Sequence, residues 1–346
     1  MNTKEIENIL NYKMDTLLDG ISEICRTNLV SGDFFVENST SSQEAFFKDL
    51  KKNIIISGGC IPSLYLDEDV NDYDIYITDK EVLNKLITLL IEIWNKFKYA
   101  VKLTDVPQLE VINNKDSNDI KIVKSGETST SEIYSNNSSV DGLVNNVKSI
   151  EETTFFNEDK KDSPEWINQE SYIGKTKKNI EKINKFSNIE SIQGIIPTYI
   201  SPRAIMLNND MHIIIHSYKN IEEIHKNFDF EHCKNYWKYQ DKKLYINLES
   251  IEAILNKQLK YTNSLYSLSS LLRAFKFVKR GWSIQPSDIL KILFQIRELE
   301  LSSVDDLKNH LGAMDIIYVN RLVKKIKNVS ISGINVISAI NELENE

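Results

Sequence analysis

The sequence predicts an α+β protein in which a mixed α/β part is followed by an all-helical part. Two observations predict this order. Short β-branched runs alternate with helical patterns between residues 53 and 97, and further strand-like segments lie at 194–218. From about residue 248 onward, apolar residues recur at helical spacing up to the end of the sequence.

The first 52 residues are predicted to be a separate helical segment. Apolar residues recur at helical spacing near the start, at Ile6, Ile9, Leu10 and Met14. A second helical pattern follows in SSQEAFFKDLKK (41–52), where a serine at the start can cap the helix.

The next segment alternates between strands and helices. NIIISGG (53–59) is a β-branched run that two glycines stop, and CIPSLYL (60–66) can form a turn of helix. DYDIYIT (72–78) alternates polar and apolar residues as a strand does. KEVLNKLITLLIEIWNKF (80–97) is the strongest amphipathic helix of the sequence.

A long polar stretch interrupts this pattern at about 113–190. It is rich in Ser, Asn and Glu and poor in periodic apolar residues, so it is predicted to be an insertion or a mobile lid. The segments GIIPTYISPRAIML (194–207) and MHIIIHSY (211–218) after it are predicted to be strands joined by a tight turn. The predicted domains are therefore 1–52, an α/β domain at 53–247 with this insertion, and a helical domain at 248–346.

Composition and charge exclude several classes of protein. No run of eighteen apolar residues occurs and the first residues do not resemble a signal peptide, which predicts a cytoplasmic protein without a membrane span. Three cysteines without C-x-x-C spacing argue against disulfides and against a Cys-rich zinc site. A net charge of -8 gives no global attraction to nucleic acid, so any such contact must be local, as in LLRAFKFVKRGW (272–282) or NRLVKKIKN (320–328).

The glycine pair Gly58 and Gly59 is the first candidate site. Glycines between a strand and a helix let the backbone approach a phosphate, because they lack Cβ and the helix start presents free N–H groups. A tight exit from the strand, without any ligand, is the structural alternative.

Asp72 and Asp74 are the second candidate site. Residues two apart on a strand point to the same face, so both carboxylates lie together while Tyr73 and Ile75 face the other side. Two like charges at this distance are costly unless a cation lies between them, and carboxylate oxygens suit Mg²⁺ (or Mn²⁺). A solvent-facing edge strand is the structural alternative.

The combination of these features resembles a known enzyme superfamily. A strand that ends in Gly-Gly, a short helix and a second strand with Asp-x-Asp is similar to the nucleotidyltransferases that include DNA polymerase beta. SGGCIPSLYLDEDVNDYDIYIT (57–78) resembles the GG-x-x-R-D-x-L-L-G…D-x-D segment of bacterial poly(A) polymerases and CCA-adding enzymes. HKNFDFEHCKNYWKYQDKKLYIN (225–247) and SSLLRAFKFVKRGWSIQPSDILK (269–291) are similar to later segments of the same head and neck, in the same order. The amino-acid sequence of these segments also resembles uncharacterised nucleotidyltransferase-like proteins of large tailed bacteriophages.

This resemblance implies a nucleotidyltransferase head followed by a helical neck-like domain. It implies transfer of a nucleoside monophosphate from an NTP to a hydroxyl, most simply on RNA such as a tRNA 3′ end or a poly(A)-like tail. The implied catalytic residues and metal ligands are Asp72 and Asp74. The implied nucleotide-binding residues are Gly58, Gly59, Ser63, Asp229 and Arg273, and the implied RNA contacts are Lys276, Lys279 and Arg280.

The sequence departs from the family pattern in two places. The family's Arg-Asp after the glycines is Pro62-Ser63, and the strand that often carries a Glu and an Arg has His212 and His216 in those places. No third carboxylate is therefore assigned. Two alternatives stay open, namely an enzyme of this fold that modifies a protein or a small molecule, and a catalytically silent binding protein. The oligomeric state is not predicted.

Overall fold

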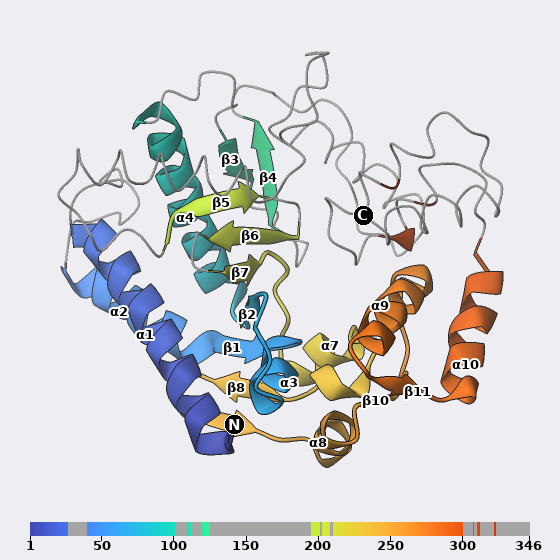
Figure 1. The fold of residues 1–346 in the computed structure, drawn as a ribbon. Helices are drawn as coiled ribbons and strands as arrows, with labels where there is room; N and C mark the ends of the chain where they lie inside the picture. Colours follow the sequence, from blue (N-terminus) through green and yellow to red (C-terminus); the bar gives the residue numbers. More distant parts are fainter. Residues whose placement is uncertain are drawn as a thin grey trace. The chain divides into compact units, whose positions relative to one another are not determined.

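The computed structural model describes residues 1–26, 40–100, 109–112, 120–124, 195–200, 203–207 and 210–299, with the single positions Leu307, His310, Leu311 and Leu322. These residues form a mixed sheet and several helices, so the protein is of the α+β class as predicted (Figure 1). The chain divides into two compact units. The first unit contains the described residues up to His225 and Cys233–Ile251, and the second contains Lys226–His232 and the residues from Glu252 onward.

A seven-stranded sheet forms the centre of the first unit. Its strand order is β5-β6-β7-β2-β1-β8-β9. The strands are β1 (Ile54–Ser57), β2 (Tyr73–Ile77), β5 (Pro197–Ile200), β6 (Ala204–Leu207), β7 (Met211–Ile214), β8 (Tyr236–Lys238) and β9 (Lys243–Tyr245). β2 and β7 run parallel, and every other neighbouring pair is antiparallel. The two earliest strands therefore lie in the middle of the sheet, between strands that come much later in the sequence.

The register of the central strands sets the position of two polar residues. Asp74 of β2 lies opposite His212 of β7, and Ile75 lies opposite Ile213. On the other side of β2, Ile75 also pairs with Ile56 of β1. β2 is hydrogen-bonded to a neighbouring strand on each edge. The backbone at Asp74 is therefore held in place from both sides.

Helices cover this sheet and bury its apolar residues. They are α1 (Thr3–Arg26), α2 (Thr40–Asn53), α3 (Cys60–Tyr65), α4 (Lys80–Ala100) and α7 (Ile221–Lys226), and the short 3₁₀ helix Glu231–Cys233 lies across the boundary of the units. The predicted helices at 41–52 and 80–97 correspond to α2 and α4. Asp79 starts α4 by accepting a hydrogen bond from the Val82 N–H at 3.0 Å. Trp94 of α4 and Trp237 of β8 are among the largest fully buried side chains.

A separate hairpin extends the ordered structure into the range predicted as a polar insertion. β3 (Leu109–Ile112) pairs antiparallel with β4 (Lys121–Lys124). Ile120, directly before β4, is 4% exposed, and Leu109 is 2% exposed. Residues 113–119 and 125–190 of that range lie outside the described residues, and the predicted domain boundaries stay a prediction.

The second unit is not all-helical, and that prediction was wrong. Besides α8 (Leu248–Leu255, which crosses into it), α9 (Ser267–Lys279) and α10 (Pro286–Arg297), it contains two short strands, β10 (Gln258–Leu259) and β11 (Ser283–Ile284), which pair in parallel. Gly281 has a φ of +84°, which lets the chain turn after α9 so that the Ser283 N–H reaches the Lys257 carbonyl at 2.8 Å. The helical pattern predicted beyond residue 299 lies outside the described residues, apart from Leu307, His310, Leu311 and Leu322.

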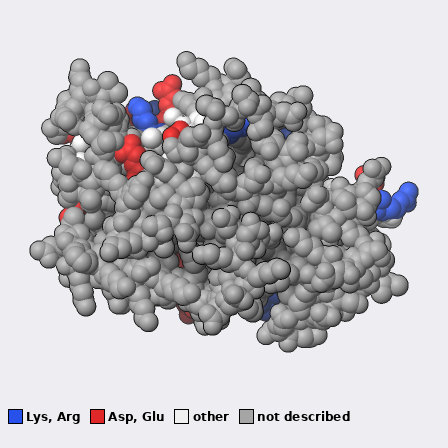
Figure 2. All heavy atoms as spheres, turned by 90° about the horizontal axis from the view of Figure 1, so that it is seen from above, with Lys and Arg blue, Asp and Glu red and all other residues white. Residues whose placement is uncertain are grey.

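No helix among the described residues is long and apolar enough to cross a membrane. The described side chains that reach the face drawn in Figure 2 include both acidic and basic groups, without a single sign prevailing. This mixture agrees with a charge of -8 spread over the whole sequence.

Candidate metal and nucleotide site

The turn after β1 brings the backbone unusually close to a carboxylate. Gly58 has a φ of +106°, and a Cβ added there would lie 3.1 Å from Oδ2 of Asp74. The positive φ favours a glycine, and a side chain there would also crowd this carboxylate. Gly59 is different, since its φ is -66° at the start of α3 and an added Cβ would meet nothing within 4 Å. Gly58 is therefore fixed by the neighbouring strand, whereas Gly59 tolerates a side chain within the protein.

The hydroxyl of Ser57 anchors the end of β1 just before this turn. It donates a hydrogen bond to the Asn235 carbonyl at 2.8 Å and contacts Nε2 of His225 at 3.0 Å. Since a hydroxyl has one hydrogen, Nε2 of His225 carries the proton and donates to the Ser57 oxygen. Burial, followed by the nearby Lys234, lowers the pKa of His225 to about 4, so the ring is neutral at pH 7.

Asp72 and Asp74 both face away from the core. Tyr73 and Ile75 are 6% and 1% exposed, whereas the side chains of Asp72 and Asp74 are 44% and 30% exposed. The alternation that the sequence predicted is therefore present at residues 72–75, whereas Tyr76 and Ile77 are both buried.

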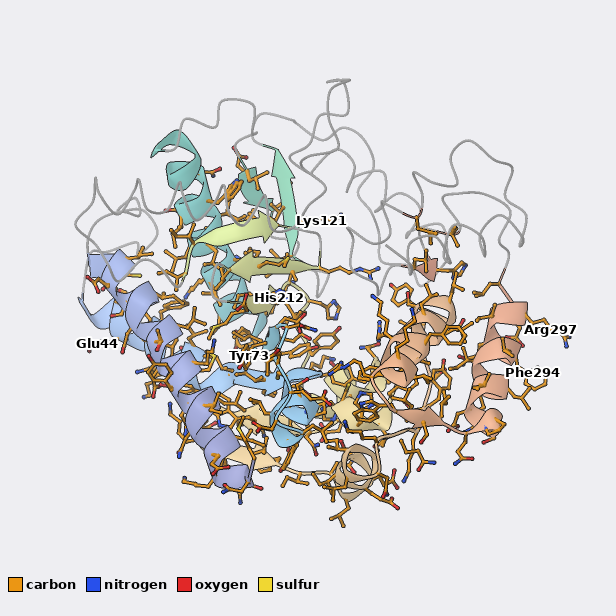
Figure 3. All side chains as sticks on the ribbon, in the orientation of Figure 1. Glu44, Tyr73, Lys121, His212, Phe294 and Arg297 are labelled. Carbon is orange, nitrogen blue, oxygen red and sulfur yellow. The ribbon has the colours of Figure 1, made fainter. Side chains whose placement is uncertain are left out.

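His212 completes a cluster with the two carboxylates. Its Nδ1 lies 3.6 Å from Oδ2 of Asp72 and 3.8 Å from Oδ1 of Asp74, and one ligand atom from each of the three residues lies within 4.8 Å of the others. Figure 3 labels His212 on β7 and Tyr73 on the adjacent β2. The sequence did not assign His212 as a ligand. The available signal was its place near the start of a strand where the enzymes that the sequence resembles often carry a Glu.

The two carboxylates create a negative potential that reaches a buried thiol. Burial, then the charges of Asp74 and Asp72, raise the pKa of the Cys60 thiol well above its ordinary value. Without a bound cation, Cys60 therefore stays protonated. Two carboxylate oxygens, one imidazole nitrogen and this negative potential together fit a divalent cation.

Ser63 lies on the helix that the glycine turn begins. Its N–H donates to the Gly59 carbonyl at 3.3 Å, and its side chain is partly exposed. Gly58, Gly59 and Ser63 thus belong to one turn-helix segment beside Asp74. Their contact with a nucleotide stays a prediction.

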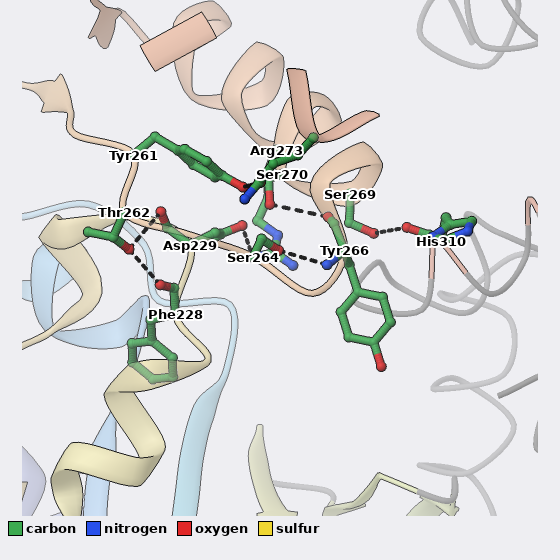
Figure 4. A network of polar contacts seen from close by, with 11 residues as sticks. Phe228, Asp229, Tyr261, Thr262, Ser264, Tyr266, Ser269, Ser270, Arg273 and His310 are labelled. Carbon is green, nitrogen blue, oxygen red and sulfur yellow. Dashed lines mark hydrogen bonds and ion pairs between the residues drawn. The ribbon is translucent and has the colours of Figure 1, made fainter. Parts of the chain in front are cut away.

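The other predicted nucleotide-binding residues, Asp229 and Arg273, pair with one another in the second unit. Nη1 of Arg273 donates to Oδ2 of Asp229 at 2.6 Å (Figure 4). The Asp229 side chain is only 6% exposed and that of Arg273 is 32% exposed. The Asp229 carbonyl accepts from the Thr262 N–H at 2.9 Å, which fixes the same segment. A nucleotide-binding role for this pair stays a prediction.

The predicted RNA contacts lie on the last turns of α9. Lys276, Lys279 and Arg280 are all exposed. They follow Arg273 on a helix whose buried residues include Leu272 and Ala274.

Comparison with known proteins identifies the family. The model of the Gabija anti-defense 2 family matches residues 33–257, which is more than half of the chain. The chain belongs to the Gabija anti-defense 2 family. The part that matches this family contains the glycine turn, Asp72, Asp74 and His212, and it ends before α9.

One solved structure is similar at a distance. It is the Thermotoga maritima CCA-adding enzyme complexed with tRNA, at 11% identity and a TM-score of 0.34, with 86% of this chain and 53% of that chain covered. This member of the Gabija anti-defense 2 family thus spans about half the length of that enzyme. No curated protein matches the sequence.

Proposed function

We propose that this protein is a metal-dependent nucleotidyltransferase that moves a nucleoside monophosphate from an NTP to a hydroxyl. Asp72 and Asp74 hold the divalent cation, and the Gly58–Gly59 turn with Ser63 holds the triphosphate. The site belongs to the first unit alone, so each of these roles can be tested by substitutions there.

One observation carries this proposal: a Cβ added to Gly58 would lie only 3.1 Å from Oδ2 of Asp74, so the glycine turn and this carboxylate are close neighbours. A backbone turn suited to phosphate and a carboxylate suited to a cation thus form one site rather than two. A solvent-facing edge strand does not explain the arrangement, because β2 has hydrogen-bonded neighbours on both sides.

In the proposed reaction the acceptor oxygen attacks the α-phosphorus. A new P–O bond forms, the bond between the α-phosphorus and the α,β-bridging oxygen breaks, and pyrophosphate leaves with the electron pair. The bound cation supplies charge neutralisation at the phosphates and lowers the pKa of the acceptor hydroxyl. Asp72 and Asp74 would hold this cation beside the acceptor hydroxyl, the proton of the hydroxyl would pass to solvent, and the N–H groups at the start of α3 would bind phosphate oxygens.

For the acceptor we propose a component of the defence that the family is named for opposing. Covalent addition of a nucleotide to a protein hydroxyl places a charged group on its surface and can block its contacts. This choice corresponds to the protein-modifying alternative that the sequence left open.

An RNA hydroxyl is the second candidate, favoured by Lys276, Lys279 and Arg280 on α9. Exposed cations at helical spacing suit a phosphate backbone. Incubation of the protein with each α-labelled NTP, a divalent cation, and either RNA or the purified defence components separates the two acceptors by which macromolecule becomes labelled.

The decisive variant is the double substitution Asp72→Asn and Asp74→Asn. Label transfer is expected to disappear, while the melting temperature stays level or rises because like-charge repulsion is relieved. The matched control is Asp69→Asn, an exposed carboxylate in the same connection between α3 and β2. Unchanged transfer in the double variant rules out the proposed enzyme.

A further inference from the structure

We propose that His212 is the third metal ligand and that it makes the site select Mn²⁺ over Mg²⁺. This inference rests on the proposed metal site at Asp72 and Asp74. It concerns which cation the site takes, rather than whether it takes one.

The geometry allows one cation to contact all three residues. Two ligand atoms that each lie about 2.1 Å from the same ion are at most about 4.2 Å apart. Nδ1 of His212 lies 3.6 Å and 3.8 Å from the nearest oxygens of Asp72 and Asp74, which is inside this limit. The third pair, the two carboxylates, lies within 4.8 Å, so small side-chain adjustments bring all three ligand atoms onto one ion.

The sheet fixes His212 in this place. Asp74 and His212 are opposite one another in the parallel pair β2 and β7, and β7 also pairs with β6 on its other edge. The His212 side chain is 17% exposed, less than that of either carboxylate. A ligand carried on a paired strand and held mostly out of solvent is preorganised for binding.

The chemistry of the ligand set favours Mn²⁺. Mg²⁺ prefers oxygen ligands and gives up its water reluctantly, so an imidazole nitrogen in place of a carboxylate weakens its binding. Imidazole suits transition-metal ions, while carboxylates also suit Mn²⁺, so Mn²⁺ accepts both kinds of ligand present here. A third carboxylate at position 212 would instead favour Mg²⁺.

The opposing explanation is that His212 is only a charge partner of the two aspartates. In that case the imidazole occupies the place of a cation instead of binding one, and its removal strengthens metal binding. The two explanations therefore predict opposite changes in affinity for a His212→Gln variant.

The test measures binding of Mn²⁺ and of Mg²⁺ by calorimetry, without NTP, to the wild type, His212→Asp and His212→Gln. His216→Gln is the matched control, a partly exposed histidine that follows the same strand. We expect the Mg²⁺ dissociation constant divided by the Mn²⁺ dissociation constant to fall by about tenfold or more in His212→Asp. Substitutions near the metal ligands of other proteins change metal affinity by this amount. His216→Gln should leave the ratio unchanged.

A spectroscopic measurement reports the bond directly. Pulsed electron paramagnetic resonance of the Mn²⁺-loaded wild type should show coupling to an imidazole nitrogen, and this coupling should vanish in His212→Gln. Absence of the coupling in the wild type, or equal or tighter Mn²⁺ binding in His212→Gln, overturns the inference while leaving a carboxylate metal site intact. Failure of the proposed function looks different, because then neither cation binds and no label is transferred.

Discussion

The carboxylate of Asp229 and the guanidinium of Arg273 form a largely buried ion pair, with Nη1 2.6 Å from Oδ2. Asp229→Asn leaves Arg273 without its counter-charge, so we expect the second unit to lose about 3 kcal/mol of unfolding free energy. Urea unfolding followed by the fluorescence of Trp282 measures this loss, since Trp282 is buried in that unit.

The matched control is Glu252→Gln, which breaks the more exposed pair between Glu252 and Lys260. Its cost should stay below about 1 kcal/mol, because water screens exposed pairs. If both substitutions lower the free energy of unfolding by the same amount, burial does not make the Asp229 ion pair more stabilising than an exposed pair.

Gly58→Ala is expected to disturb both stability and metal binding. The positive φ makes any side chain there costly, by about 1 to 3 kcal/mol, and the added Cβ presses on Oδ2 of Asp74. Calorimetry with Mn²⁺ should therefore show weaker binding together with a lower melting temperature. Gly59→Ala, where an added Cβ meets nothing within 4 Å, should change neither quantity. Unaltered Mn²⁺ affinity in Gly58→Ala would contradict the close coupling of turn and carboxylate.

The buried His232 should make the second unit sensitive to acid. Burial, then the charges of Arg280 and Arg273, lower its pKa to about 3, and its ring lies 4.6 Å from that of Trp282. The unfolded chain binds this proton at about pH 6.5, so the stabilisation is complete above that pH and is lost as the pH falls toward 3. Between pH 6.5 and 4.5 the wild type should lose about 2 kcal/mol more than a His232→Leu variant, measured by urea unfolding at each pH.

The control for this measurement is His216→Gln, which changes a histidine of the first unit that remains partly exposed. Its pH profile should follow that of the wild type. A His232→Leu profile as steep as the wild-type profile would assign the acid sensitivity to other groups.

The basic end of α9 separates an RNA acceptor from a protein acceptor. If Lys276 and Lys279 contact phosphates, changing both to Gln should weaken RNA binding and flatten the log-log salt dependence by slightly under one unit for each contact. Lys51→Gln with Lys52→Gln, at exposed positions on α2, is the charge-matched control. If the α9 substitutions leave RNA affinity unchanged, the defence component remains the proposed acceptor.

Local patterns were sufficient to predict the elements that carry the candidate site. The β-branched run before Gly58 and the alternation around Asp74 are properties of a few neighbouring residues, and β1 and β2 form there. The same reasoning placed α2 and α4, whose apolar residues recur along a single helix.

Pairing between distant segments was beyond such patterns. His212 joins the aspartates only because β7 lies parallel to β2, and no local periodicity records which strands become neighbours. The two-residue strands β10 and β11 were missed for a related reason, since a parallel pair this short depends on the turn at Gly281 rather than on its own composition. The sequence did not predict β4. Its lysines and the polar residues around it leave only one buried apolar position there, which does not make a strand pattern.

The strand order also constrains how the protein is made. β1 and β2 leave the ribosome early, but their outer edges are completed only by β8 and β7, which are translated far later. At the usual speed of synthesis this delay is on the order of ten seconds. During that time an isoleucine-rich strand pair exposes open backbone edges that can join other chains. Until β8 has emerged these edges stay unpaired, and a chain truncated before β7 lacks the partner strands on both outer edges of the β1–β2 pair.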